Sequence, residues 1–182
     1  MRQPPKILAR HLVARSRLFR VEEVELEFAN GARRRYERIP GGRDSVLIVP
    51  LLDPDTLLLI REYGAGSERY ELGFPKGVVE PDEEPLAAAN RELQEEIGYG
   101  AGRLRIIARL SLVPGYIQHR SLIVLAQDLY PSRLPGDEPE PIEVVPWCLS
   151  ELGALLQRED FDEARAIAAL FLTQRLLAEE RG

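Results

Sequence analysis

Alternating apolar and polar side chains mark the first regular element of the chain. Between residues 14 and 28, Val24, Leu26 and Phe28 are separated by glutamates, which is the period of two expected for a half-buried β-strand. The Asn30-Gly31 pair that follows favours the positive φ angles of a tight hairpin turn. Residues 20–40 are therefore predicted to form two antiparallel strands, and such a hairpin must pack against something to be stable.

Further along the chain, short apolar runs and helically spaced apolar positions predict a mixed sheet flanked by helices. The predicted strands are residues 45–52, 56–63, 103–113, 121–129 and 143–147. Two helices are predicted, over residues 83–97 and 162–178. Their predicted core stripes are Leu86, Ala89, Leu93 and Ile97 in the first, and Ile167, Leu170, Phe171 and Leu177 in the second.

Proline and glycine at residues 40–42 predict a loop between the hairpin and the first buried strand. We therefore expect an N-terminal β-hairpin subdomain over residues 1–43, which serves as a dimerisation element, and a main domain over residues 44–182. A chain of 182 residues is long enough for one well-buried domain with a small appendage.

Composition narrows the function classes. A net charge of −6 and a pI near 5.2 argue against nucleic acid as the main partner. The single Cys148 excludes an internal disulfide framework and favours a reducing, cytoplasmic setting. No apolar run approaches the roughly 18 residues of a membrane span, so a soluble protein is expected. The first twenty residues contain basic and no acidic side chains, which leaves a transit peptide as a minor alternative.

Three glutamates crowd the end of the first predicted helix. Glu92 and Glu96 are four residues apart, and Glu95 lies about 60° from Glu92 around the helix. Like charges at this spacing repel, and the helix dipole disfavours anions in the last turn. A solvated acidic face is the plain interpretation. The three glutamates form an arc that borders the core stripe with Leu93, however, so at least Glu96 is expected near the edge of the core. Uncompensated negative charge is costly there, and a bound divalent cation would neutralise it.

The type of side chain indicates which cation. Carboxylate oxygens suit Mg²⁺, which keeps several waters and binds substrate phosphates. Zinc prefers thiolate and imidazole ligands. The chain has one cysteine and only two histidines, His11 and His119. These are too few to favour a zinc site or a Cys/His nucleophile.

The residues from Gly77 to Tyr99 resemble the signature of the Nudix hydrolases. Gly77, Glu83 and the run RELQEEIGY stand at the spacing of that motif. Tyr99 is a soft departure, because an aliphatic residue is usual there. The resemblance implies a Nudix fold, which is an α/β/α sandwich with a mixed sheet. It also implies metal-dependent cleavage of a nucleoside diphosphate that is linked to another moiety.

Roles follow from this resemblance position by position. It implies Mg²⁺ as cofactor, with Mn²⁺ as a substitute, held by Glu92, Glu95, Glu96 and the backbone carbonyl of Lys76. Arg91 would orient the glutamates, Glu95 would also be catalytic, and Glu83 would support the loop.

Segments spread over nearly the whole chain resemble the ADP-ribose pyrophosphatase branch of the family, in particular bacterial hydrolases of ADP compounds. They include residues 13–38, 70–77 and 126–141. Pro114 resembles a proline that the ADP-ribose branch has after the motif. Tyr116 resembles a tyrosine that is associated with hydrolysis of dinucleoside polyphosphates. The implied activity is hydrolysis of ADP-ribose and diadenosine polyphosphates, with NADH as a further candidate, and it releases AMP and a phosphorylated product.

The loop over residues 133–144 combines prolines and acids, which is typical of an exposed surface loop. In ADP-ribose pyrophosphatases such a loop brings an acid over the metals, and Glu138 and Glu140 match it by position. Either glutamate would act as the general base, or would position the water or a further metal.

Arginines and aromatic side chains are candidates for substrate binding. Guanidinium groups pair with phosphate oxygens, which favours Arg38 and Arg61, although ordinary strand-surface charge explains each of them as well. Tyr116 and Phe74 are candidates for stacking on adenine.

Relatives often exchange the N-terminal region across a two-fold axis, so a homodimer is expected. Two other functions stay open: a non-catalytic domain that senses ADP-ribose-like ligands, and an RNA-end pyrophosphohydrolase.

Overall fold

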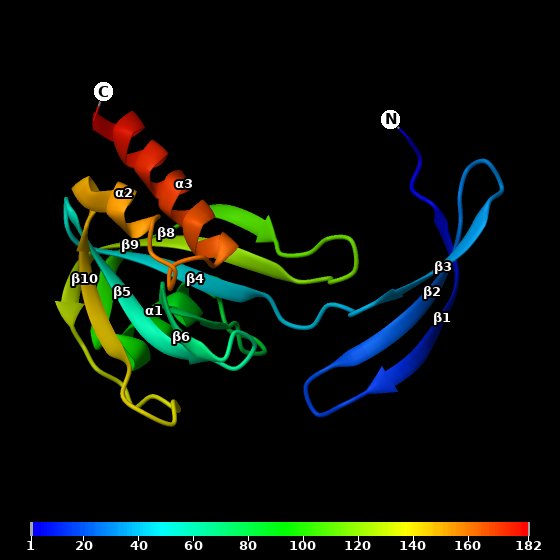
Figure 1. Ribbon diagram of the computed structural model, residues 1–182, viewed down its shortest axis with the longest axis horizontal. Helices are drawn as coiled ribbons and strands as arrows, with labels where there is room; N and C mark the ends of the chain where they lie inside the picture. Colours follow the sequence, from blue (N-terminus) through cyan, green and yellow to red (C-terminus); the bar gives the residue numbers. More distant parts are fainter. Residues whose placement is uncertain (1, 182) are drawn as a thin grey trace. The chain divides into compact units, whose positions relative to one another are not determined.

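Figure 1 traces the chain in the computed structural model, which describes residues 2–181. The chain divides into two units. The first contains the chain up to residue 43 together with residues 111–120, and the second contains residues 44–110 and the chain from residue 121 on. The grouping of residues 111–120 with the N-terminal segment had no signal in the sequence.

The N-terminal unit is built on a three-stranded antiparallel sheet in the order β1-β2-β3. Its strands are β1 Lys6–Arg15, β2 Arg20–Glu27 and β3 Arg33–Arg38. The predicted hairpin is β2 and β3, with Gly31 at φ +80° in its turn. Strand β1 was not predicted, because its apolar residues come in adjacent pairs rather than alternating.

The second unit contains a seven-stranded mixed sheet with the main order β10-β5-β4-β9-β8. Strands β4 and β9 pair in parallel, while the short strands β6 and β7 pair antiparallel with β5 and β4. The strands are β4 Ser45–Asp53, β5 Thr56–Gly64, β6 Arg69–Gly73, β7 Lys76–Val78, β8 Tyr99–Ser111, β9 Arg120–Pro131 and β10 Glu143–Cys148. All five predicted strands of this sheet are confirmed.

Helices cover both faces of this sheet, which makes the predicted α/β/α sandwich (Figure 1). Alternate residues of β4 point to opposite faces: Val46 and Ile48 pack with α1 (Pro85–Glu96), whereas Leu47 and Val49 pack with α3 (Ala164–Arg181). The short α2 (Leu152–Leu155), preceded by a 3₁₀ turn at Leu149–Glu151, joins the second face. Among the residues that the structure describes, no helix is long and apolar enough to cross a membrane.

Both predicted helices form, and two members of the predicted core stripes are wrong. Leu86 is 36% exposed because it lies in the first turn of α1, whereas Leu93 is fully buried. Phe171 is 51% exposed. It lies about 100° around α3 from the buried Leu170, and therefore outside the stripe.

An ion-pair network holds the segment before α3 against the sheet. Asp160 accepts hydrogen bonds from Arg61 (Nη1, 2.6 Å) and from Arg158 (Nε, 2.8 Å). Arg158 also lies over the Trp147 ring, 5.7 Å from its centroid. The two guanidinium groups, Arg158 first, lower the pKa of Asp160 from 3.8 to about 2. The ionised carboxylate therefore stabilises the folded state.

Replacing this carboxylate tests the network. Because its folded pKa is below its ordinary value, its stabilisation is complete above about pH 4 and is lost as pH falls through about 2. Asp160→Asn is expected to lower the free energy of unfolding at pH 7 by about 2 kcal/mol. Urea titrations should show this difference shrinking from pH 4 downward. Glu159→Gln, an exposed neighbour, is the control, and a difference independent of pH would contradict the assignment.

Candidate functional site

The predicted acidic arc exists on the last turns of α1, and it is not a solvated face. Glu96 is only 6% exposed, and the side chains of Glu92 and Glu95 are 12% and 24% exposed. Burial raises the pKa of Glu92 and raises that of Glu96 to about 8. Glu92 and Glu96 are therefore held where ionisation is costly.

Arg91 partly neutralises this arc from the same helix. Its Nη1 donates to Glu92 (2.7 Å) and to Glu95 (2.9 Å). Its Nε donates to Glu83 (2.9 Å), and its Nη2 reaches both Glu83 and the backbone carbonyl of Val78 (3.1 Å each). These partners raise the pKa of Arg91, with Glu83 contributing most. One guanidinium thus fixes the two glutamates and ties them to the loop before the helix.

Strand β7 supplies the other side of the arc. The backbone amide of Lys76 donates to Glu96 (3.1 Å), while its Nζ donates to Glu62 on β5 (2.5 Å). Gly77 lies directly against Glu92, since a Cβ at this position would fall 2.0 Å from the Glu92 carboxyl carbon. The glycine is therefore required for Glu92 to take its place in the site.

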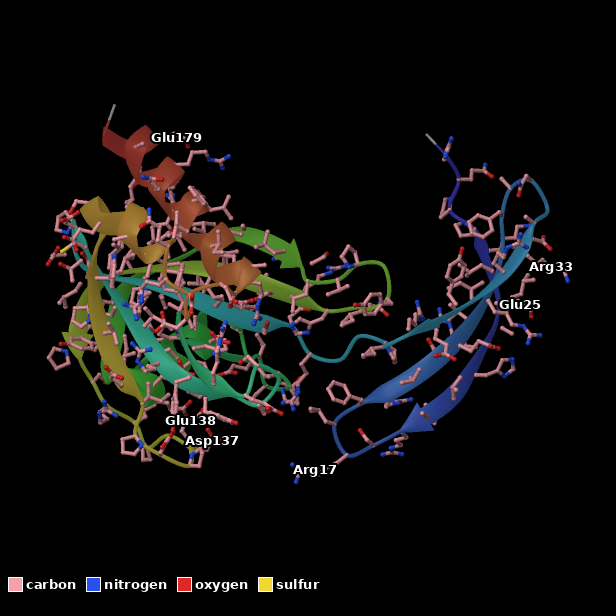
Figure 2. All side chains as sticks on the ribbon, viewed as in Figure 1. Arg17, Glu25, Arg33, Asp137, Glu138 and Glu179 are labelled. Atoms are coloured by element: carbon pink, nitrogen blue, oxygen red, sulfur yellow. The ribbon has the colours of Figure 1, made fainter. Side chains whose placement is uncertain are left out.

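Lys76, Gly77, Arg91 and the three glutamates on α1 line a cleft of about 390 Å³ on the second unit, which we call the acidic cleft. The loop between β9 and β10 closes part of it with Pro135, Gly136, Asp137 and Glu138. Figure 2 shows Asp137 and Glu138 on this loop. Burial and the neighbouring Glu62 and Asp137 raise the pKa of Glu138.

Glu140 is placed differently from Glu138. It lines an adjoining cleft of about 480 Å³ that also contacts Glu95, Glu96 and Glu138. Its carboxylate accepts a hydrogen bond from the hydroxyl of Tyr70 (2.6 Å). The structure therefore brings both predicted loop glutamates near the arc, but only Glu138 lines the acidic cleft itself.

The donor set of the acidic cleft fits a hard divalent cation. As the side chains stand, the described residues contain no group of three or more His, Cys, Asp or Glu arranged to hold a metal ion. Glu92 and Glu95 instead accept hydrogen bonds from Arg91. Yet the groups are oxygen ligands and they are partly buried. Burial raises the pKa of Glu92 and Glu96, so their ionised forms lack compensating positive charge. A dication would supply that charge.

The four predicted substrate-binding residues lie in different surroundings. Arg61 is engaged by Glu143 (3.0 Å) and Asp160, with its side chain 25% exposed. Phe74 is 1% exposed and packs edge-on against Phe161, so it has no free ring face for adenine. Arg38 and Tyr116 belong to the N-terminal unit.

Within that unit, Arg38 and Tyr116 line one cavity of about 520 Å³, together with Tyr36 and Pro114. Arg38 pairs there with Glu22 (2.8 Å), and Tyr116 is 57% exposed. The loop with Pro114 and Tyr116 is tied to the end of the hairpin, because the Ile39 amide donates to the Tyr116 carbonyl (2.8 Å).

Two residues near the acidic cleft were not singled out from the sequence. Glu62 holds the Lys76 side chain, and only the pairing of β5 with its neighbours reveals that contact. Arg133 lines the adjoining cleft with Glu95 and Glu138. It packs over Gly98, where a Cβ would lie 2.9 Å from the Arg133 Nε. The sequence signal for Arg133 was only a basic residue at the start of an acidic loop.

Comparison with known proteins agrees with the motif. Residues 5–38 match the model of the NudE-type Nudix hydrolase N-terminal domain, and residues 41–170 match the NUDIX domain. The chain is 54% identical to the ADP compounds hydrolase NudE of Escherichia coli, over 96% of this chain and 94% of that protein. It is 30% identical to an ADP-ribose pyrophosphatase of Bacillus subtilis, over 84% and 82% of the two chains.

A solved structure shows the same fold. The crystal structure of an ADP compounds hydrolase is similar with a TM-score of 0.93 and 52% identity, covering 99% of this chain and 97% of the other.

Substituting Gly77 tests whether the position of Glu92 matters for cation binding. Gly77→Ala is expected to displace the flexible Glu92 carboxylate and not the backbone, because the clash is with the end of that side chain. Calorimetry should show Mg²⁺ affinity reduced about tenfold or more, with the melting temperature nearly unchanged. Gly153→Ala, which meets nothing within 4 Å, is the control. Unchanged Mg²⁺ affinity in Gly77→Ala would show that Glu92 is not a ligand.

Proposed function

Because the chain belongs to the Nudix hydrolase family, in its NudE-type branch, we propose that it hydrolyses the pyrophosphate bond of ADP-linked compounds. ADP-ribose and diadenosine polyphosphates are the first candidates, and NADH is a third. Water attacks one phosphorus and the bridging P–O bond breaks, so that AMP and a phosphorylated product leave. The acidic cleft is the observation that carries this proposal.

The cofactor is proposed to be Mg²⁺, with Mn²⁺ as a substitute. Glu92, Glu95, Glu96 and the backbone carbonyl of Lys76 would hold it. When bound, the cation neutralises charge that develops on the pyrophosphate. The chain's own contribution is to keep these oxygens in place: Arg91 orients Glu92 and Glu95, and the Lys76 amide orients Glu96.

Glu138 is the stronger candidate for the general base. It lines the acidic cleft, whereas the Glu140 carboxylate is occupied by the Tyr70 hydroxyl. A base must lie within hydrogen-bond reach of the attacking water, or one water away. Glu140 is proposed to act indirectly, by holding the loop that carries Glu138.

Substrate binding is proposed for Arg38 and Tyr116, which line one cavity of the N-terminal unit. An arginine and an exposed aromatic ring are suited to a phosphate and a base. Arg61 is the weaker candidate, since two carboxylates already engage it. Phe74 is the weakest of the four candidates, because its side chain is only 1% exposed.

Residues 1–43 are proposed as a dimerisation element and residues 44–182 as the hydrolase domain. Apolar side chains are exposed along the edge strand β1 and the turn that follows it: Ile7, Leu8, Leu12, Val13, Leu18 and Phe19. We call these six side chains, which lie on both faces of β1 and in the turn after it, the apolar patch. Exposed apolar side chains in this number mark an interaction surface, and a second copy of the chain buries them most simply. A cytoplasmic location remains a prediction from the single cysteine.

The two other functions make different predictions in one assay. A panel of ADP-ribose, diadenosine triphosphate, NADH and capped RNA should show turnover of the ADP compounds. Tight ADP-ribose binding with no turnover would favour a ligand sensor, and turnover of capped RNA alone would favour an RNA-end hydrolase.

Replacing Glu96 is the sharpest test of the catalytic assignment. Glu96→Gln keeps the size of the side chain but removes the charge of a buried proposed ligand. Turnover in saturating Mg²⁺ is expected to fall about 10³-fold, with an unchanged circular dichroism spectrum. Glu84→Gln, exposed at the start of the same helix, should retain full activity. Near-normal turnover in Glu96→Gln would refute the ligand role.

The dimer is tested at β1. Leu12→Lys combined with Leu18→Lys places two charges in the exposed apolar patch without disturbing a buried side chain. Light scattering should show the wild type at twice the chain mass and the variant at the chain mass. A variant that stays dimeric, or a wild type that is monomeric, would contradict the proposal.

A further inference from the structure

Tyr70 on β6 reaches the loop between β9 and β10. Its hydroxyl donates a hydrogen bond to the Glu140 carboxylate (2.6 Å). Tyr70 lines neither the acidic cleft nor the adjoining cleft that contains Glu140, so it holds this glutamate from outside the site. The pKa of Tyr70 is raised above its ordinary value, chiefly by the hydrogen bond to Glu140. The hydroxyl therefore stays protonated, and able to donate, at neutral pH.

Two neighbouring strands hold the ring of Tyr70. In the antiparallel pairing of β5 with β6, Tyr70 lies opposite Tyr63. The two rings meet edge to face, with 5.5 Å between their centroids and 69° between their planes. Aromatic pairs across two strands stabilise the sheet and favour this geometry. The sheet thus gives the Tyr70 hydroxyl a defined position, from which it binds Glu140.

The loop is anchored at both ends and at one point between them. At its start, the amide of Leu134 donates to a carbonyl group of α1 (3.1 Å). At its end, Glu143 begins β10 and pairs with β5. For residues 135–142, the bond from Tyr70 to Glu140 is the only hydrogen bond to the rest of the chain that the structure describes. The middle of the loop therefore depends on this one contact.

Two prolines carry the position of Glu140 to Glu138. Pro139 separates the two glutamates, and Pro141 follows Glu140. A proline fixes its own φ at about −65° and disfavours the helical region for the residue before it. Each glutamate precedes a proline, so this stretch of backbone has few conformations. Because Glu138 accepts no hydrogen bond from any described residue, its place at the acidic cleft is set by that backbone.

We propose that Tyr70 is a positioning residue for hydrolysis, whose hydroxyl holds Glu138 at the acidic cleft through Glu140. The inference rests on the proposed function and deepens it, because it names a residue outside the cleft that sets the geometry of the proposed general base. A base must lie within hydrogen-bond reach of the attacking water. A misplacement of about 1 Å is enough to slow a reaction about 100-fold.

Removing a single oxygen atom tests the proposal. Tyr70→Phe keeps the ring against Tyr63 and removes only the hydroxyl. With ADP-ribose and saturating Mg²⁺, kcat is expected to fall about tenfold while KM changes less than about threefold, because the hydroxyl contacts the loop and not the cleft. Tyr63→Phe is the matched control. It removes the hydroxyl from the other ring of the same pair and should leave both constants unchanged.

A double-mutant cycle tests whether Tyr70 acts through Glu140. Glu140→Ala should lower kcat to the same extent as Tyr70→Phe, since each variant loses the same hydrogen bond. The double variant should fall no further than either single variant. Effects that multiply in the double variant would show that the two residues act independently, and would overturn the proposal.

Nuclear magnetic resonance relaxation measures the order of the loop without any turnover. The order parameters of the Glu138 and Glu140 amides should fall in Tyr70→Phe and keep their wild-type values in Tyr63→Phe. The melting temperature and the Mg²⁺ affinity should be unchanged in both variants.

The outcomes separate this inference from the proposed function. A wild-type protein that does not hydrolyse ADP compounds rejects the proposed function, whatever the order of the loop. With an active wild type, unchanged kcat and order parameters in Tyr70→Phe reject Tyr70 as a positioning residue. Equal losses of kcat in Tyr70→Phe and Tyr63→Phe also reject it, because they would assign the effect to the ring pair and not to the bond with Glu140.

Discussion

The contacts of Arg91 with three glutamates are the interactions on which the acidic cleft depends. Removing one partner from a partly buried charge cluster leaves the others uncompensated, which is costly. Here a single guanidinium touches Glu83, Glu92 and Glu95, and so couples the loop before α1 to the end of that helix. Glu96, which is buried deepest, is held by the Lys76 amide instead. The cluster is thus geometrically fixed but still short of positive charge.

Much of the fold follows from local pattern, because buried strands and amphipathic helices leave their period in the sequence. The strands that were missed show where this fails. Strand β6 alternates apolar and charged residues over only five positions and is exposed at its start, and β7 has only three residues, so neither period is long enough to stand out. Strand β1 has its apolar side chains exposed on both faces. Its presence depends on pairing with β2, which no local pattern encodes.

The residues of the site also divide into those that local spacing predicts and those that depend on tertiary packing. Glu92, Glu95 and Glu96 were predictable as a group because one helical turn fixes their spacing, and the family motif names them. The contact of Glu62 with Lys76 and the placement of Arg133 beside Gly98 depend on tertiary packing. The joining of Pro114 and Tyr116 to the hairpin unit is also long-range. Phe74 shows the converse, since an aromatic residue in a motif is buried as core.

The charge balance of the acidic cleft determines when a pyrophosphate can enter it. The acidic cleft has more carboxylates than cations, so a pyrophosphate is repelled from it unless a dication is present. Lys76 links the acidic cleft to β5, through its backbone amide on Glu96 and its Nζ on Glu62. A change in the length or charge of this side chain therefore acts on Glu62. The glutamates on α1 keep their places, because Arg91 holds Glu92 and Glu95 and the Lys76 backbone amide holds Glu96.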